Sequence, residues 1–480
     1  MPILSADCVH EILKYVEDDT KTVHSCVLIN RMWCETSVPF LWRNPWKVNI
    51  PYSKRKVSIA LFMSLFSCLE KDIKRFFYEC NIHPFDLSKH GFFSEALFQY
   101  PKYSRSLDLK KLSTIIGHQF SNEDHKVLVN QEILKMILLK SRSIKKIIML
   151  GIEAPYPLSN CLWADDSLSQ LVELQCDCDD ALFYYGLARH CRNIEKLDVI
   201  CGADNLGLTS LIALQSSLKS LRCEAYDNLH EFGKALSKYQ STSLLELEIF
   251  EGKCIPIEFF SSFVNLKRLK IGYIEDICDP KDLHALEYTI LPNLEFLSAD
   301  IELPRLNILT RLISSTIGNL THIFLGSYIP DNATQHIEPY HQTISKHCPN
   351  LNYVSTFFYE GNENSTFGLE ELIRSCNKLR GIIFNSLSAN SSGFDLFNMV
   401  RRFAPSTLSD IKIVGNCGLQ SCYLEWFLES WRSRLPLSLS ISEDVYELSE
   451  KLERVKNKFL EVGVLRNYEV LDYLRDFESD

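Results

Sequence analysis

The sequence predicts an α/β fold in which short parallel strands alternate with helices along most of the chain. A small group of three helices precedes this region, and a C-terminal helical cap follows it. Three observations lead to this fold class. A short aliphatic motif recurs at regular spacing, helical patterns lie between its copies, and the first 46 residues hold three of the six tryptophans. At 480 residues, the chain also exceeds the usual limit of about 250–300 residues for a single core.

The recurring motif reads aliphatic, two residues, aliphatic, one residue, then apolar or small, as in the LKRLKI that begins at Leu266. Successive copies lie 22 to 31 residues apart, which is the period of a leucine-rich repeat, lengthened in places. We therefore expect a leucine-rich-repeat solenoid over residues 106–435, with a degenerate first strand in Ser106–Leu112. The first aliphatic residues of the eleven copies are Ile144, Leu171, Ile194, Leu218, Leu244, Leu266, Leu294, Leu320, Leu351, Leu379 and Leu408.

The segments between the motifs carry apolar residues three and four positions apart, which is typical of amphipathic helices. Neither a strand nor a helix of one unit can bury its apolar face alone, so we expect the units to stack around one continuous core. The clearest helical segments are Asp179–Cys191, Asn228–Tyr239, Pro280–Ile290 and Gly368–Cys376.

Three cysteines stand three residues before a repeat aliphatic residue. They are Cys191, Cys348 and Cys376, and their position resembles that in the cysteine-containing subclass of leucine-rich repeats. Because a small thiol accepts burial well, we expect them to be structural.

Residues 436–480 are predicted to form a helical cap on the open end of the solenoid. Ser442 is a candidate N-cap, and acidic residues follow it in the first turn, where they suit the helix dipole. A second helix is expected from about Leu465 to Phe477. A partner-binding tail is the alternative. The apolar stripe of the first of these helices is Val445, Leu448, Leu452, Val455 and Phe459.

Residues 1–46 are predicted to form three short helices, followed by a helical linker or N-terminal cap over residues 47–105. Ser5 is a candidate N-cap for the first helix, the second is expected to begin near Thr20, and the third holds Trp33. Three helices of this length bury little surface. Large rings of about 150–250 Å² each supply the missing area, which accounts for the tryptophans. A plain three-helix cap on the solenoid is one interpretation.

One series of residues runs through this segment in a recognisable order: Leu4, Val9, Ile12, Leu13, Val16, Val23, Cys26, Leu28, Arg31-Met32-Trp33 and Leu41-Trp42-Arg43. This order resembles an F-box, with Ser5 where the family usually has proline. An F-box followed by leucine-rich repeats is the arrangement of substrate receptors of Skp–cullin–F-box ubiquitin ligases. The resemblance implies that the helices dock on a Skp-type adaptor, and through it on a cullin–RING ligase, while the repeats bind a protein substrate. It implies a non-catalytic subunit, not an enzyme. A non-catalytic scaffold outside any ligase is the alternative.

Two groups of contact residues are expected. Strand alternation places the third, fifth and seventh motif positions on the concave side, which is acidic in the early repeats and aromatic in the middle ones. Exposed rings tend to mark interfaces, although a register shift of one residue would turn them inward. The predicted substrate-binding residues are Phe296, His322, Phe324, Tyr353 and Phe357. The adaptor-binding residues implied by the resemblance, some of which must instead be core, are Leu4, Ser5, Cys8, Val9, Ile12, Leu28, Ile29 and Trp33.

Composition argues against several other classes. A net charge of −10 disfavours nucleic-acid binding, which calls for a basic face. An acidic N-terminal segment argues against a secretory signal, and no apolar stretch approaches the roughly 20 residues of a membrane span. We therefore expect a cytoplasmic or nuclear protein with reduced cysteines and no membrane partner. Neither His10-Glu11 nor His230-Glu231 continues to the second histidine of a zinc motif, so no metal and no cofactor are expected.

Overall fold

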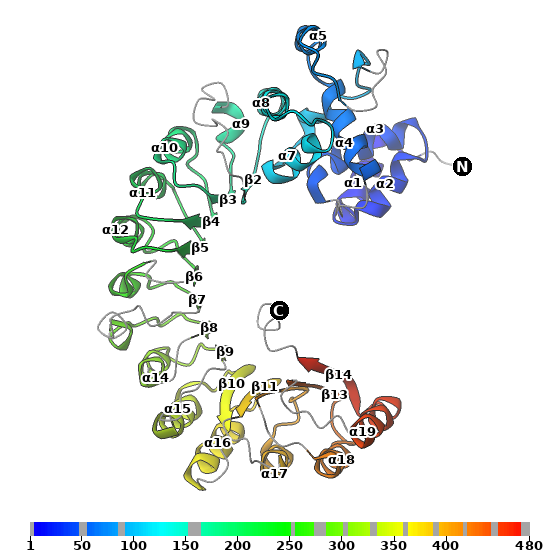
Figure 1. Cartoon of the computed structure of the whole chain (residues 1–480). Coiled ribbons are helices and arrows are strands. Elements are labelled where there is room, and N and C mark those ends of the chain that lie inside the picture. The colour runs from blue at the N-terminus through cyan, green and yellow to red at the C-terminus, as the bar shows by residue number, and fades with distance from the viewer. Residues whose placement is uncertain are drawn as a thin grey trace. The chain divides into compact units, whose positions relative to one another are not determined.

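The computed structural model describes residues 4–47, 55–84, 92–151, 165–250, 255–272, 285–300, 306–326, 334–358, 363–386, 393–415, 420–442 and 450–471. The chain divides into two compact units, Met1–Ser220 and Leu221–Asp480. The division falls inside the predicted repeats, and each unit contains both strands and helices (Figure 1).

Three short helices begin the first unit: α1 (Ala6–Tyr15), α2 (Thr20–Val27) and α3 (Arg31–Leu41). Each starts at a side-chain N-cap, which satisfies backbone N–H groups that the helix itself leaves unpaired. Ser5 and Asn30 each accept one such bond, and Asp19 accepts two. The helices lie where the apolar patterns predicted them. Their shared core is formed by Val9, Leu13, Val23 and Phe40.

The chain that leaves α3 is fixed to the first strand, β1 (Ser106–Asp108). The Arg43 carbonyl accepts hydrogen bonds from the backbone N–H groups of Arg105 and Ser106, at 2.8 and 3.1 Å. The indole N–H of Trp46 donates to the Ser106 carbonyl at 2.8 Å, and Trp46 is buried in the short helix η1 (Pro45–Lys47). The three helices are therefore attached to the repeats by main-chain bonds.

The three tryptophans of this segment pack at two places, the three-helix core and the junction with the repeats. Trp33 packs against the core with part of its ring exposed. Trp42 stacks on Tyr100 of η2 (Tyr100–Tyr103), with 4.4 Å between ring centroids. Two of the three tryptophans thus join the helices to the rest of the first unit, a role that the sequence alone does not distinguish from core packing.

The remainder of the first unit is helical before it becomes a repeat. Strands β1 to β4 pair in parallel and in sequence order. The elements are α4 (Arg55–Ser67), α5 (Lys71–Glu79), α7 (Leu109–Gly117), α8 (Glu123–Lys140), β2 (Lys146–Met149), α9 (Asp165–Leu168), β3 (Glu173–Asp177), α10 (Ala181–His190), β4 (Lys196–Cys201) and α11 (Leu206–Ala213).

The second unit continues the alternation, and β6 to β14 pair in parallel, each with the next. In Figure 1, α14 to α19 follow one another along one side of these strands. The elements, with β5 beginning at the division between the units, are β5 (Ser220–Ala225), α12 (His230–Tyr239), β6 (Glu246–Phe250), η4 (Ile257–Ser262), β7 (Arg268–Ile271), β8 (Phe296–Ala299), α14 (Leu306–Ser314), β9 (His322–Leu325), α15 (Thr334–His347), β10 (Tyr353–Phe358), α16 (Glu363–Ser375), β11 (Gly381–Ser386), α17 (Phe394–Phe403), β12 (Asp410–Val414), α18 (Ser421–Ser430), β13 (Leu437–Ser442), α19 (Glu450–Glu461) and β14 (Leu465–Leu471).

The predicted repeat fold is confirmed. Every one of the eleven motif copies starts a strand two residues after its first aliphatic residue, and each of those aliphatic side chains is at most 1% exposed. Helices also form in three of the four segments expected, whereas residues 280–284 of the fourth lie outside the described residues. Cys191, Cys348 and Cys376 are buried, and burial raises the pKa of each thiol, to about 12, 12 and 11. These three thiols are therefore protonated at neutral pH, as structural cysteines should be.

The predicted C-terminal helical cap is wrong in two respects. Ser442 ends strand β13 instead of capping a helix, and Leu465–Leu471, expected to be helical, is strand β14, parallel to β13. The edge of β13 offers unpaired N–H and C=O groups, and a strand satisfies them where a helix cannot. The segment is thus one more repeat unit. Residues 443–449 and 472–480, part of the same prediction, lie outside the described residues.

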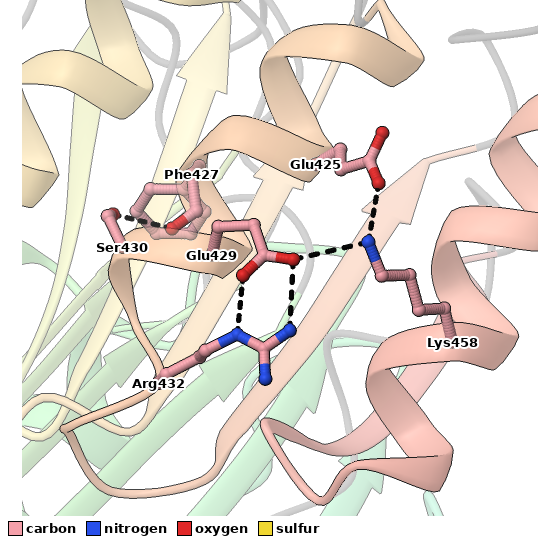
Figure 2. A network of polar contacts seen from close by, with 6 residues as sticks. All are labelled: Glu425, Phe427, Glu429, Ser430, Arg432 and Lys458. Atoms are coloured by element: carbon pink, nitrogen blue, oxygen red, sulfur yellow. Dashed lines mark hydrogen bonds and ion pairs between the residues drawn. The ribbon is translucent and has the colours of Figure 1, made fainter.

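Charged side chains connect α19 to the preceding helix, α18 (Figure 2). The Lys458 ammonium lies 2.7 Å from the Glu425 carboxylate and 3.2 Å from that of Glu429. The Arg432 guanidinium donates two hydrogen bonds to Glu429, one to each carboxylate oxygen. These hydrogen bonds, first from Arg432 and then from Lys458, lower the pKa of Glu429 to about 2. Because the network is exposed to solvent, it orients the two helices more than it stabilises them.

The motif aliphatic residues should carry most of the stability of their repeats. Leu320→Ala should lower the free energy of unfolding by about 2–5 kcal/mol, because it leaves a cavity at a fully buried position. Ile317, three residues earlier, is 76% exposed, so Ile317→Ala should change it by about 0.5 kcal/mol or less. Urea unfolding followed by circular dichroism measures both. Equal effects from the two variants would contradict the assigned core.

Candidate functional site

A row of side chains crosses four neighbouring strands of the second unit. The strand register places Arg268 of β7, Phe296 of β8, His322 of β9 and Tyr353 of β10 opposite one another. Equivalent residues on paired strands lie on the same face, about 4.8 Å apart, so their side chains form one continuous row. Together with Phe324, two residues further along β9, we call this row the aromatic ladder.

The rings of the aromatic ladder contact one another. The Arg268 guanidinium lies 3.6 Å from the centroid of the Phe296 ring, and Phe296 lies 5.8 Å from His322. His322 stacks on Tyr353 at 5.3 Å, with 10° between their planes, and Phe324 lies 5.5 Å from Phe296. All five side chains are half-buried. The structure therefore brings together four of the five residues predicted for substrate binding.

Two glycines of the following repeat units leave room for aromatic rings. A Cβ atom on Gly381 of β11 would come within 2.3 Å of the Tyr353 ring, and one on Gly272 would come within 2.9 Å of Phe250. Phe250 is flanked by two cations, since the Arg222 guanidinium lies 4.5 Å and the Lys270 ammonium 4.8 Å from its centroid. The Phe250 ring and its two cations therefore lie next to the strand that begins the ladder.

The ladder is apolar at neutral pH apart from its arginine. Burial, and secondarily the charge of Arg268, lowers the pKa of His322, so this ring is neutral in the folded protein. Its Nδ1 lies 2.8 Å from the hydroxyl of Thr321. Arg268 binds Glu248 through Nε at 3.2 Å, which compensates its charge. Such a surface suits ring-shaped, uncharged groups.

Phe357, the fifth residue predicted for substrate binding, is placed wrongly by the sequence pattern. It is 2% exposed and lies 6.0 Å from the ring of Tyr340 on α15. From Val354 to Phe358, every residue of β10 is buried, so burial does not alternate along this strand. The neighbouring Ile383 and Val414 are also buried, with Phe324 packed against them. The accessible part of the ladder therefore ends at Phe324 and Tyr353.

The residues expected to bind an adaptor separate into two groups. Val9 is wrong as a surface residue, because it is 0% exposed and belongs to the core of the three helices. Trp33 is half-buried against that core, and Ser5 caps α1 while remaining exposed. Tyr15, which the motif does not include, is also highly exposed on α1. The remaining predicted residues, all exposed, are Leu4, Cys8, Ile12, Leu28 and Ile29.

No protein-family model matches the chain, and no curated protein matches it. Among solved structures, the chain is similar to the crystal structure of the Rad7 and Elc1 complex in yeast, with a TM-score of 0.42 and 13% identity. That likeness covers 76% of this chain and 86% of the other. A likeness at this level establishes neither a family nor a function.

Among the residues that the structure describes, no three His, Cys, Asp or Glu side chains are grouped in a way that could hold a metal ion. In the same ranges, no helix is both long enough and apolar enough to cross a membrane.

A buried histidine behind the ladder should make the second unit sensitive to acid. His341 of α15 is fully buried, and its Nε2 lies 2.6 Å from the hydroxyl of Thr356 on β10. Burial lowers its pKa from the ordinary 6.5 to about 3. The unfolded chain takes up a proton near pH 6.5 and the folded chain does not. The stability contributed by neutral His341 is therefore complete above pH 6.5 and is lost as the pH falls toward 3.

Lowering the pH from 7.5 to 5.0 should thus reduce the free energy of unfolding by about 2 kcal/mol through His341. His341→Asn should remove most of this pH dependence. His347→Asn, at an exposed position on the same helix, is the control and should keep the pH dependence of the wild type. Urea unfolding at the two pH values measures the difference. A wild-type slope that persists in His341→Asn would show that other groups cause it.

Proposed function

We propose that this chain is the substrate receptor of a Skp–cullin–F-box ubiquitin ligase. Its first three helices bind a Skp-type adaptor, and its repeats bind a protein substrate. The observation that carries the proposal is the exposure of apolar side chains at positions that the F-box resemblance assigns to the adaptor. Leu28 is 75% exposed, and Leu4, Ile12 and Ile29 are exposed as well. All four belong to the three-helix segment, and apolar side chains exposed together on one surface typically mark a protein interface.

The first helix separates its core residues from its surface residues. Val9 and Leu13, four positions apart, are buried in the core of the three helices. Cys8 and Ile12, also four apart, are exposed, and residues at this spacing share a helix face. Leu28 and Ile29 follow in the turn between α2 and α3. The sequence thus supplies two sets of apolar residues, of which the three helices themselves use only one.

The aromatic ladder is the proposed substrate surface. Its rings are half-buried and contact one another, which pre-orders them for binding and limits the entropy lost when a partner docks. In this role the chain positions the substrate and contributes no catalytic group. Holding a substrate lysine near a ubiquitin-charged conjugating enzyme raises the effective concentration of that lysine. We therefore propose that the chain is a non-catalytic subunit that acts in the cytoplasm or nucleus.

A second function is favoured by a different observation. The Arg43 carbonyl and the Trp46 indole bind β1, so the three helices also cover the first strand of the repeats. A non-catalytic scaffold, in which these helices are only a cap, would need this junction. It would not need Ile12, Leu28 and Ile29 to be exposed, and for that reason we favour the receptor.

Co-purification with a Skp-type adaptor tests the proposal. The double variant Ile12→Asp, Leu28→Asp should bind the adaptor at least about 30-fold more weakly, because each change places a charge in an apolar contact. Its melting temperature should stay near that of the wild type, since both side chains are exposed. Leu182→Asp on α10, where the leucine is 69% exposed, is the matched control and should retain the adaptor. A wild-type chain that captures no adaptor would favour the scaffold.

A further inference from the structure

We infer that the aromatic ladder binds an extended peptide segment in which an aromatic side chain and a carboxylate stand about three residues apart. This inference rests on the proposed function in one respect, namely that the ladder takes a protein partner. It adds the chemistry of the segment that is bound.

The aromatic half of this segment follows from the rings of the ladder. Phe296, His322, Phe324 and Tyr353 form a connected group with ring centroids 5.3 to 6.1 Å apart. Each ring is only half-buried, and His322 is neutral because burial lowers its pKa. Aromatic pairs at such distances contribute about 0.5–1.5 kcal/mol beyond the area that they bury. A further ring placed on this surface continues the same packing.

The carboxylate follows from Lys270. Its ammonium lies over the Phe250 ring at 4.8 Å, and its side chain is half-buried. The neighbouring Arg268 is already paired with Glu248. Lys270 lies opposite Glu248 of β6 in the strand register, but that carboxylate pairs with Arg268, and among the described residues Lys270 itself forms no ion pair. A cation that has lost part of its hydration gains from a charge-assisted bond to an incoming carboxylate.

The spacing follows from the strand register. His322 and Phe324 are on β9 and Lys270 is on β7, two strands away. Two strand spacings amount to about 9–10 Å, and an extended peptide advances about 3.3 Å per residue. A ring held at β9 and a carboxylate held by Lys270 are therefore about three residues apart along a peptide that crosses the strands.

Single-stranded nucleic acid also stacks on aromatic rings, and it is the competing partner class. The adjoining strand β6 carries Glu246 and Glu248, and Asp300 follows β8. These carboxylates repel a phosphate backbone, which is charged at every nucleotide, more than a peptide with one carboxylate, and the net charge of −10 acts in the same sense at longer range. The electrostatics of the ladder and its surroundings thus favour a peptide.

An immobilised peptide array tests the inference with the full-length chain as the soluble probe. Each peptide is a twelve-residue Gly/Ser chain with one Tyr and one Glu, separated by one to six positions. Retention should be greatest when the two are about three positions apart. It should fall at least tenfold when Glu is replaced by Gln or Tyr by Ala. A mixed-sequence single-stranded oligonucleotide is spotted beside them, and stronger retention there would overturn the inference.

A charge exchange provides the sharper test. Lys270→Glu should lose the Tyr/Glu peptides and gain peptides in which Lys replaces Glu at the same spacing. Lys412→Glu, at a half-buried lysine on β12, is the matched control and should keep the wild-type preference. Phe324→Ala should weaken every aromatic peptide. If that variant unfolds because Phe324 also packs on Ile383 and Val414, the Lys270 exchange still decides. An unchanged preference in Lys270→Glu would refute the inference.

Adaptor co-purification is measured on the same variants. Lys270→Glu and Phe324→Ala lie in the second unit, whereas the residues proposed for the adaptor belong to the first, so both variants should retain it. Peptide preference that fails while the adaptor is retained overturns only the inference about the segment. An adaptor that never binds the wild-type chain overturns the proposed function instead.

Discussion

The whole arrangement depends on one constraint: no strand–helix unit of this chain can bury its own apolar face. Each motif supplies two aliphatic residues to a core that only the neighbouring units complete. Leu294 and Leu297, for example, are both fully buried. The backbone N–H groups of Glu295 and Phe296 both donate to the Lys267 carbonyl of the preceding unit, at 2.8 and 2.9 Å. Core burial and main-chain bonding together fix each strand on its predecessor, without freedom to slide.

Because of this fixed register, residues that occupy the same motif position in successive repeats lie in one row across the strands. Arg268, Phe296, His322 and Tyr353 are 26 to 31 residues apart along the chain, yet they lie opposite one another on paired strands. An interaction surface can therefore be built one residue at a time, one from each repeat, while the aliphatic positions stay unchanged. Apart from Phe324, which also packs on Ile383 and Val414, the ladder residues are not part of a described core cluster, so they can vary with less effect on packing than the aliphatic positions.

A row of stacked strands leaves an unpaired edge at each end, and the two units treat these edges differently. In the first unit, Arg43 and Trp46 bond to the backbone at the start of β1, which ties the three N-terminal helices to the repeats. In the second unit, β14 pairs with the edge of β13, and the ion pairs of Lys458 with Glu425 and Glu429 connect the helix between these strands, α19, to α18. Because the Arg43 carbonyl bonds to main-chain N–H groups, the position of the helices relative to β1 does not depend on flexible side chains alone.

The sequence by itself determined what depends on local period. The motif determined where each strand starts, the Ser5 cap and the apolar patterns placed the first three helices, and alternation placed four residues of the ladder. Only the tertiary structure decided the cases in which two arrangements share one local pattern. Val9 and Ile12 are both apolar residues of α1, and packing against Val23 and Phe40 decides which is core. The local pattern of Leu465–Leu471 predicts a helix, and the open edge of β13 selects a strand instead. Phe357 follows the alternation of its strand, but it is buried because that part of β10 is covered, and coverage is a property of neighbours that no local pattern records.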